Sequence, residues 1–132
     1  AKYFNTDFVI CDKNREKANE VKSVQVIGNV EGKDVIIIDD LIDTGGTISM
    51  ASKVIMEKGA NSVRALISHP VLSGNAEENL ENSVLEELVV TDSIPLKFRN
   101  KKIKVLSIAG LIAKAIRKIH ENESTSSLFI NR

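Results

Sequence analysis

The order of apolar and polar residues along the chain predicts alternating strands and helices. Short apolar runs indicate strands, and apolar residues spaced three or four positions apart indicate helices. Strands are expected near residues 7–11, 24–30, 34–39, 63–68, 87–91 and 103–106, and helices near residues 47–58 and 107–121. This alternation is typical of an α/β fold with an open, mostly parallel sheet flanked by helices.

Few signals interrupt this pattern. Glu31-Gly32-Lys33 predicts a turn between two strands, and Pro70 should stop the strand that ends at Ser68 from extending further. Residues 73–86 are polar and predict a short helix or a loop. With 132 residues, of which 42% are hydrophobic, the chain is expected to form one domain, residues 1–132, with a core of its own.

Residues 35–47 form the most informative segment, because an apolar strand runs there into carboxylates and a glycine loop. Val35 to Ile38 are all apolar, which predicts a strand that is covered on both faces. The chain should leave the sheet at Asp39, the carboxyl end of this strand. Ligands of open α/β sheets bind at that end.

From Thr47 the apolar spacing becomes helical, so the loop opens a helix, with Gly59 as its expected stop. Free backbone N–H groups and the positive end of the helix dipole predict a phosphate site at Thr44 to Thr47. Gly45 and Gly46 would allow a ligand to approach that backbone closely.

The same segment excludes the commoner phosphate loops. No lysine follows the glycines, as a nucleoside triphosphate loop requires, and the chain has no Gly-x-Gly-x-x-Gly fingerprint. Asp39 and Asp40 would repel a polyphosphate but suit vicinal ribose hydroxyls, directly or through a divalent cation. The alternative is that this pair only ends a strand and that Asp43 with Thr44 only caps a helix. The segment as a whole favours a phosphosugar site.

A second candidate segment, residues 12–19, carries cations at alternate positions, among them Lys13 and Arg15. Its charge predicts a solvated, mobile loop. A Lys-x-Arg loop is by itself ordinary surface. Its position ahead of the acidic segment makes both cations candidates for the site.

Composition narrows the possible partners. Acidic and basic residues number 18 each, so no net charge attracts nucleic acid or an anionic membrane. The single cysteine, Cys11, ends an apolar run and is interpreted as a core thiol. Neither His69 nor His120 has partners at metal-ligand spacing. Without a membrane-length apolar run or a visible signal peptide, a soluble, cytoplasmic protein is expected.

The expected helix at residues 107–121 has one apolar side. It consists of Leu111, Ile112, Ala115, Ile116 and Ile119. An ordinary core face explains this stripe, and an interface is the alternative.

These segments together resemble one family. Val35 to Thr47 resembles the phosphoribosyl-diphosphate signature of the type I phosphoribosyltransferase fold, and its Asp-Thr-Gly-Gly-Thr ending resembles ribose-phosphate diphosphokinases, also called phosphoribosyl-diphosphate synthetases. The resemblance continues through residues 68–74, 82–83, 87–95, 105–110 and 124–129. It covers nearly the whole chain, and the later segments separate the synthetases from other enzymes of the fold.

The resemblance implies that the β,γ-diphosphate of ATP moves to the C1 hydroxyl of ribose 5-phosphate, which gives 5-phosphoribosyl 1-diphosphate and AMP. The implied site residues are Lys13 and Arg15 for the transferring group, Arg15 also for substrate binding, Asp39 and Asp40 for the ribose hydroxyls and associated magnesium, and Asp43, Thr44, Gly45, Gly46 and Thr47 for the 5-phosphate. It further implies Mg²⁺ as cofactor, a homohexamer, and control by phosphate and ADP.

Ala1 to Phe4 resemble the end of a helix whose beginning is absent. The resemblance implies that an amino-terminal domain with most of the ATP pocket is absent from this chain, so the isolated chain is expected to be inactive. Two alternatives remain open. A regulatory relative of the synthetase would keep the fold without the chemistry, and a phosphoribosyltransferase would need a hood segment that we do not find in the sequence.

Overall fold

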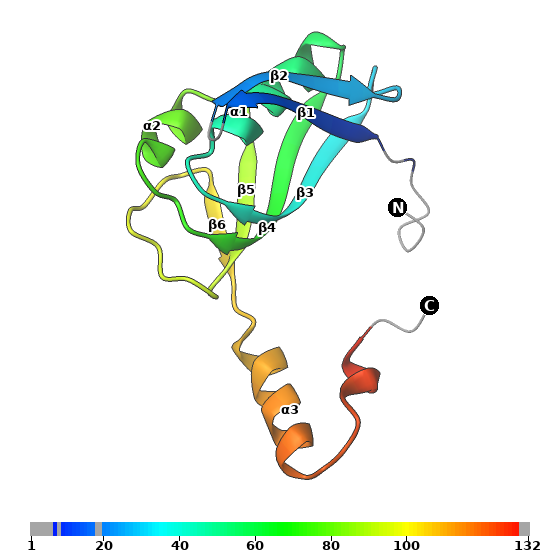
Figure 1. Cartoon of the computed structure of the whole chain (residues 1–132), viewed down its shortest axis with the longest axis vertical. Coiled ribbons are helices and arrows are strands. Elements are labelled where there is room, and N and C mark those ends of the chain that lie inside the picture. Colours follow the sequence, from blue (N-terminus) through cyan, green and yellow to red (C-terminus); the bar gives the residue numbers. More distant parts are fainter. Residues whose placement is uncertain (1–6, 8, 18–19, 130–132) are drawn as a thin grey trace.

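A computed structural model of the chain describes residues 7, 9–17 and 20–129. Its elements in chain order are β1 (Ile10–Lys17), β2 (Glu20–Ile27), β3 (Asp34–Ile42), α1 (Gly46–Glu57), β4 (Ser62–Pro70), α2 (Ala76–Glu81), β5 (Glu87–Thr91), β6 (Ile103–Leu106), α3 (Ala109–His120) and the 3₁₀ helix η2 (Thr125–Leu128) (Figure 1). The amino-terminal helix end expected at Ala1 to Phe4 lies outside the described residues.

The central sheet confirms the expected parallel α/β fold. Its four strands are all parallel, in the order β3-β4-β5-β6, so their carboxyl ends share one edge. Strand β4 runs through Pro70, which pairs with Ile42, so the expected stop at Ser68 is two residues early. A proline lacks only its own N–H and is tolerated where a strand ends.

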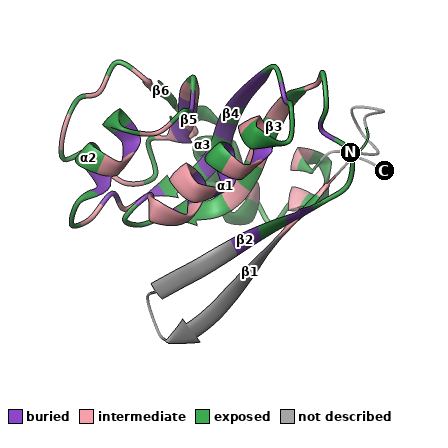
Figure 2. Ribbon diagram, turned by 90° about the horizontal axis from the view of Figure 1, so that it is seen from above, coloured by how far each residue is buried: buried purple, intermediate pink, exposed green. Residues whose placement is uncertain are grey.

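Helices α1 and α2 cover one face of this sheet and enclose the core (Figure 2). Helix α1 buries Ile48, Ala51, Ser52 and Ile55. It ends two residues before Gly59, whose φ of +88° turns the chain as expected. The strands contribute Val63, Ala65, Ile67, Leu88 and Val90 to the same core.

Strands β1 and β2 form a separate antiparallel sheet that packs against α1. Lys58 Nζ at the end of α1 donates to the Val26 carbonyl at 2.8 Å. The expected loop at residues 12–19 is therefore wrong for residues 12–17, and residues 18 and 19 lie outside the described part. Charge patterning indicates solvent exposure, but a polar segment can still satisfy its backbone by pairing with a neighbouring strand.

The second face of the central sheet is bare in the described part of the chain. Ile36 and Ile38 keep 55% and 69% of their surface exposed. The expectation that Val35 to Ile38 are covered on both faces is therefore wrong for this chain. An apolar run predicts that both faces of a strand are suited to burial, but it does not identify the segment that covers each face.

Helix α3 leaves the domain after β6 and extends away from the sheet (Figure 1). It packs against η2, and none of its residues is buried. The expectation of an ordinary core face on this helix is therefore wrong, because Leu111, Ile112, Ile116 and Ile119 all remain exposed. Within the described residues, no helix has the length and apolarity to span a membrane.

Candidate phosphate-binding site

The β3–α1 loop lies at the carboxyl edge of the sheet, between Ile42 and Gly46. Gly45 is the N-cap of α1 and has a left-handed backbone, with φ of +75°. The Ser49 N–H donates to the Gly45 carbonyl at 2.9 Å and closes the first helical turn. The preceding N–H groups of that turn have no intrahelical acceptor, and a glycine cap has no side chain to satisfy them. The loop can therefore offer backbone donors to an anion.

Asp43 and Thr44 are exposed, and neither side chain caps α1. The Asp43 carboxylate instead accepts a hydrogen bond from the Ser73 hydroxyl, and the Asp43 carbonyl accepts one from the Ser73 N–H at 3.2 Å. The structure thus contradicts the alternative that this pair only caps a helix. Asp43 ties the loop to the segment between β4 and α2.

Helix α2 holds the loop from its other side. The Asn79 side-chain amide donates to the Thr44 carbonyl at 2.8 Å, and the Asn79 carbonyl accepts from the Ser49 hydroxyl at 2.8 Å. Sequence reasoning missed Ser73, Asn79 and Ser49. The position of Ser73 and Asn79 in the sequence could have indicated them. Both follow β4, whose carboxyl end lies at the same edge of the sheet as the loop.

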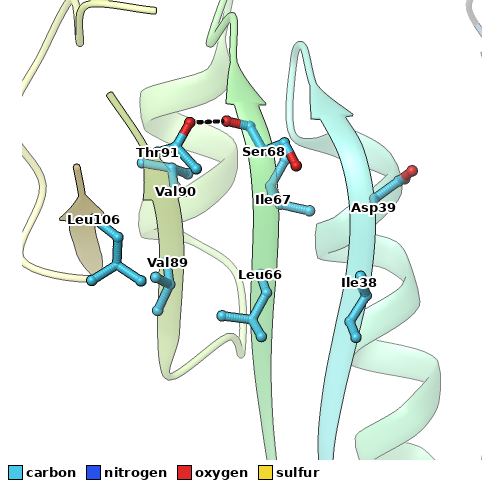
Figure 3. A pocket seen from close by; sticks show the side chains of 9 residues that line it. All are labelled: Ile38, Asp39, Leu66, Ile67, Ser68, Val89, Val90, Thr91 and Leu106. Carbon is cyan, nitrogen blue, oxygen red and sulfur yellow. Dashed lines mark hydrogen bonds between the residues drawn. The ribbon is translucent and has the colours of Figure 1, made fainter. Parts of the chain in front are cut away.

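Asp39 and Asp40 end the apolar run of β3, as expected. The Asp40 N–H donates to Asp39 Oδ1 at 3.0 Å, and Asp39 is half-buried while Asp40 is exposed. Asp39 also lines a shallow groove of about 190 Å³ across the four strands (Figure 3). The groove is mainly apolar, with Ile38, Leu66, Val89 and Leu106 among its lining residues.

A polar cluster follows β4 and β5 at the same edge. Thr91 Oγ1 and Ser93 Oγ both donate to the Ser68 carbonyl, at 2.6 and 3.0 Å, and the first of these bonds appears in Figure 3. His69 Nδ1 lies 2.9 Å from Ser93 Oγ. His69 therefore belongs to the same polar cluster through Ser93.

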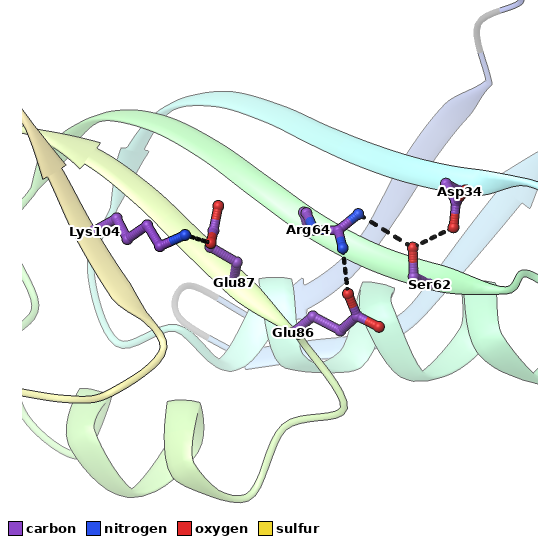
Figure 4. Close-up of polar contacts among 6 residues, drawn as sticks. All are labelled: Asp34, Ser62, Arg64, Glu86, Glu87 and Lys104. Atoms are coloured by element: carbon purple, nitrogen blue, oxygen red, sulfur yellow. Dashed lines mark hydrogen bonds and ion pairs between the residues drawn. The ribbon is translucent and has the colours of Figure 1, made fainter.

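The opposite, amino-terminal half of the sheet carries paired charges (Figure 4). Arg64 and Glu86 form an ion pair at 2.7 Å, and Lys104 pairs with Glu87. Ser62 donates to Asp34 at 2.5 Å. Exposed pairs of this kind add little stability. Because these charged side chains pair with one another, the carboxyl edge remains the better candidate for a ligand site, as is usual in open α/β sheets.

Comparison with known proteins identifies the family. Residues 9–130 match the family described as phosphoribosyl synthetase-associated domain. The chain belongs to this family. Ribose-phosphate pyrophosphokinases from Helicobacter hepaticus, Wolinella succinogenes and Campylobacter jejuni are 58%, 52% and 53% identical to it, over 93%, 98% and 98% of the chain. The chain spans only 40%, 43% and 42% of these relatives.

A solved member supports the same fold. The crystal structure of phosphoribosylpyrophosphate synthetase from Mycobacterium smegmatis matches with a TM-score of 0.73 and 41% sequence identity. The match covers 78% of this chain and 35% of that chain. The phosphoribosyl synthetase-associated domain therefore has the α/β fold expected from its sequence.

The acidic residues of this domain suit only one kind of magnesium site. Among the described residues, no three His, Cys, Asp or Glu side chains gather as a metal cluster. Mg²⁺ commonly keeps several waters and binds through one or two carboxylates together with substrate phosphates. Asp39 and Asp40 fit that mode, in which the substrate supplies part of the coordination.

Lys13 and Arg15 lie on β1 of this domain, opposite Val24 and Val21 of β2. The pairing is irregular on both sides of Arg15. The side chains of Lys13 and Arg15 lie outside the described part. Their assignment to the transferring group stays a prediction.

Proposed function

We propose that this chain binds ribose 5-phosphate as part of a ribose-phosphate pyrophosphokinase. Its β3–α1 loop carries the proposal, since it opens a helix at the carboxyl edge of a parallel sheet and is held there by Ser73 and Asn79. The pyrophosphokinases that resemble the chain over nearly its whole length support this choice. The whole enzyme would move the β,γ-diphosphate of ATP to the C1 hydroxyl of ribose 5-phosphate.

The loop would bind the 5-phosphate through backbone N–H groups at the start of α1, assisted by the Thr44 and Thr47 hydroxyls. Asp39 and Asp40 would accept hydrogen bonds from the ribose hydroxyls. Asp43 would keep the loop in register through Ser73. These assignments give the sugar one orientation, with its C1 hydroxyl directed away from the phosphate loop.

In the transfer step, the C1 oxygen would attack the β-phosphorus of ATP and release its proton to solvent, while the bond from that phosphorus to the α,β-bridging oxygen breaks and AMP leaves. Lys13 and Arg15 would stabilise the charge that develops on the transferred oxygens. Magnesium, when bound, would neutralise part of the phosphate charge. This cofactor, the hexamer and the control by phosphate and ADP rest on the resemblance alone.

Calorimetric titration of the 132-residue chain with ribose 5-phosphate and MgCl₂ tests the proposal. We expect saturable binding that falls at least about tenfold in the Asp43→Ala, Thr47→Ala double variant, because charge-assisted hydrogen bonds are among the stronger polar contacts. Ribose without phosphate should bind much more weakly. The matched control is Glu121→Ala, an exposed acidic residue beyond α3.

A folded wild-type chain that does not bind ribose 5-phosphate would contradict the proposal. Binding that is equal in the wild type and the double variant would place the phosphate elsewhere on the chain. Circular dichroism of each variant separates loss of a binding group from loss of the fold.

A further inference from the structure

Helix α2 is held firmly in place beside the β3–α1 loop. Ala76 and Leu80 anchor it in the core, with no exposed surface on either residue. Lys102 Nζ donates to the carbonyls of Leu80 and Ser83 at 2.9 and 2.7 Å, which holds the carboxyl end of the helix. A cation at this end also interacts favourably with the helix dipole. Asn79, on the same helix, is therefore presented to the loop from a restrained position.

Asn79 makes two different contacts with the loop and α1. Its side-chain amide donates to the Thr44 carbonyl, and its own carbonyl accepts from the Ser49 hydroxyl, both at 2.8 Å. The first contact reaches the peptide before the left-handed Gly45, and the second reaches the first turn of α1. Asn79 therefore connects the residue that precedes the N-cap of α1 with the first turn of the helix.

The contact with Thr44 sets the direction of a neighbouring donor. In a planar trans peptide, the carbonyl and the following N–H point in opposite directions. When Asn79 holds the Thr44 carbonyl toward α2, the Gly45 N–H must point away from α2. Rotation of this peptide would exchange the donor for a carbonyl oxygen, which repels an anion. Glycine at position 45 offers little resistance to such a rotation, because it populates both signs of φ.

We infer that Asn79 is a positioning residue of this site: it holds the Thr44–Gly45 peptide in the orientation that directs the Gly45 N–H to the phosphate of the sugar. The inference rests on the proposed function and adds to it a residue outside the loop. Asn79 acts through the Thr44 carbonyl and does not touch the ligand.

Two binding titrations and one spectroscopic measurement test this role. With ribose 5-phosphate, Asn79→Ala should bind about five- to tenfold more weakly than the wild type, the range expected when one hydrogen bond is lost. Asn82→Ala makes the same chemical change at an exposed residue on the end of α2 and should bind normally. With inorganic phosphate as probe, the Gly45 amide signal in ¹H–¹⁵N spectra should shift in the wild type and in Asn82→Ala, and respond much less in Asn79→Ala.

A second variant separates loss of the hydrogen bond from a folding defect. Asn79→Asp keeps the size of the side chain but replaces the donor with an acceptor, so it should weaken binding more than Asn82→Asp, which adds the same charge to the same helix.

The outcomes separate the inference from the proposed function. Suppose that the wild type binds ribose 5-phosphate and that both Asn79 variants keep the wild-type affinity and the wild-type response of the Gly45 amide. This result would overturn the positioning role and leave the phosphosugar site intact. Equal losses at positions 79 and 82 would also overturn it, since a general effect on α2 would then explain both. No binding by the folded wild type would overturn both claims.

Discussion

The two glycines of the β3–α1 loop, Gly45 and Gly46, differ in what a side chain at each position would disturb. Gly45 adopts φ of +75°, and a Cβ atom there would meet its neighbours at 3.8 Å, an ordinary contact. Its backbone conformation is therefore what demands glycine. A Cβ atom on Gly46 would lie 3.7 Å from Thr44 Oγ1 and 4.0 Å from Asn79 Nδ2, also without a clash. The protein fold tolerates a side chain at position 46, so any need for glycine there comes from the ligand.

This difference predicts opposite results for two alanine substitutions. Gly45→Ala should lower the free energy of unfolding by about 1–2 kcal/mol, the cost of placing an L-residue in the left-handed region. Gly46→Ala should leave stability within about 0.5 kcal/mol of the wild type. It should nevertheless weaken ribose 5-phosphate binding, because its methyl group occupies space at the helix start. Urea unfolding and calorimetric titration measure the two effects.

Each substitution is the control for the other. If Gly45→Ala proved as stable as the wild type, the left-handed conformation would not be a requirement of the folded state. If Gly46→Ala bound ribose 5-phosphate normally, the phosphate would not approach the backbone at that residue.

At the residue scale, the sequence was sufficient to predict the loop but not what holds it. The run from Asp39 to Thr47 has local signals, namely a strand end, a glycine pair and a helix start. Ser73 and Asn79 have no such local signal, only their place after β4, because their contacts with Asp43 and Thr44 form only when β4 and α2 pack beside β3 and α1.

At the scale of elements, Asp92 joins the central sheet to helix α3. Its carboxylate accepts hydrogen bonds from the Ser107 hydroxyl and from the Ile108 N–H, the latter at 2.8 Å. These bonds, the Ser107 contact first, lower the pKa of Asp92 below its ordinary value of 3.8. Ile108 is the N-cap of α3, so Asp92 holds the residue at which this helix begins.

The contribution of Asp92 should depend on pH in a definite direction. A carboxyl group whose pKa is lower in the folded state stabilises that state above its unfolded pKa, and the effect disappears as the pH falls through the folded pKa. Amide exchange at Ile108 should therefore stay slow near pH 5 and accelerate below about pH 4, after correction for intrinsic exchange. Asp92→Asn should exchange faster at pH 5 and show much less of this acid-induced change.

The Leu88 amide donates to the Lys102 carbonyl within the sheet region and does not involve Asp92, so it serves as an internal reference. Equal acceleration at Leu88 and Ile108 would indicate general acid unfolding and would contradict a local role for Asp92.

Element types were predictable where the signal is local. The apolar runs at β3, β4, β5 and β6 identify strands that pair in a parallel sheet, and the turn at Glu31 to Lys33 is confirmed by the Lys33 N–H donating to the Val30 carbonyl at 3.1 Å. The strands expected near residues 7–11 and 24–30 overlap β1 and β2, but the extension of β1 through residues 12–17 and its antiparallel pairing with β2 were not predicted. The polar residues 12–17 carry no strand pattern, and their strand conformation comes from pairing with β2.

At the scale of the whole molecule, the central sheet is covered on one side only by the described residues. Parallel sheets are usually covered on both faces. Here Ile36, Ile38, Leu66 and Leu106 remain exposed on the uncovered side, at 55%, 69%, 37% and 60%. The sequence predicted that this face suits burial, and it could not show that α3 would extend away from it.

This uncovered face should bind an apolar dye in the native state. A contiguous exposed apolar face of this kind is a typical binding surface for an apolar ligand. We expect the folded chain to enhance the fluorescence of anilinonaphthalene sulfonate, and Ile38→Lys to reduce that signal clearly, because it places a charge in the middle of the patch. Stability should change by less than about 0.5 kcal/mol, since Ile38 is mostly exposed.

Ile27→Lys is the matched control, because Ile27 is 53% exposed but lies on β2, in the separate two-stranded sheet. It should leave the dye signal close to that of the wild type. Equal losses in the two variants would mean that the dye responds to net charge. An unchanged signal in Ile38→Lys would mean that the dye binds elsewhere, with the exposed side of α3 as the next surface to test.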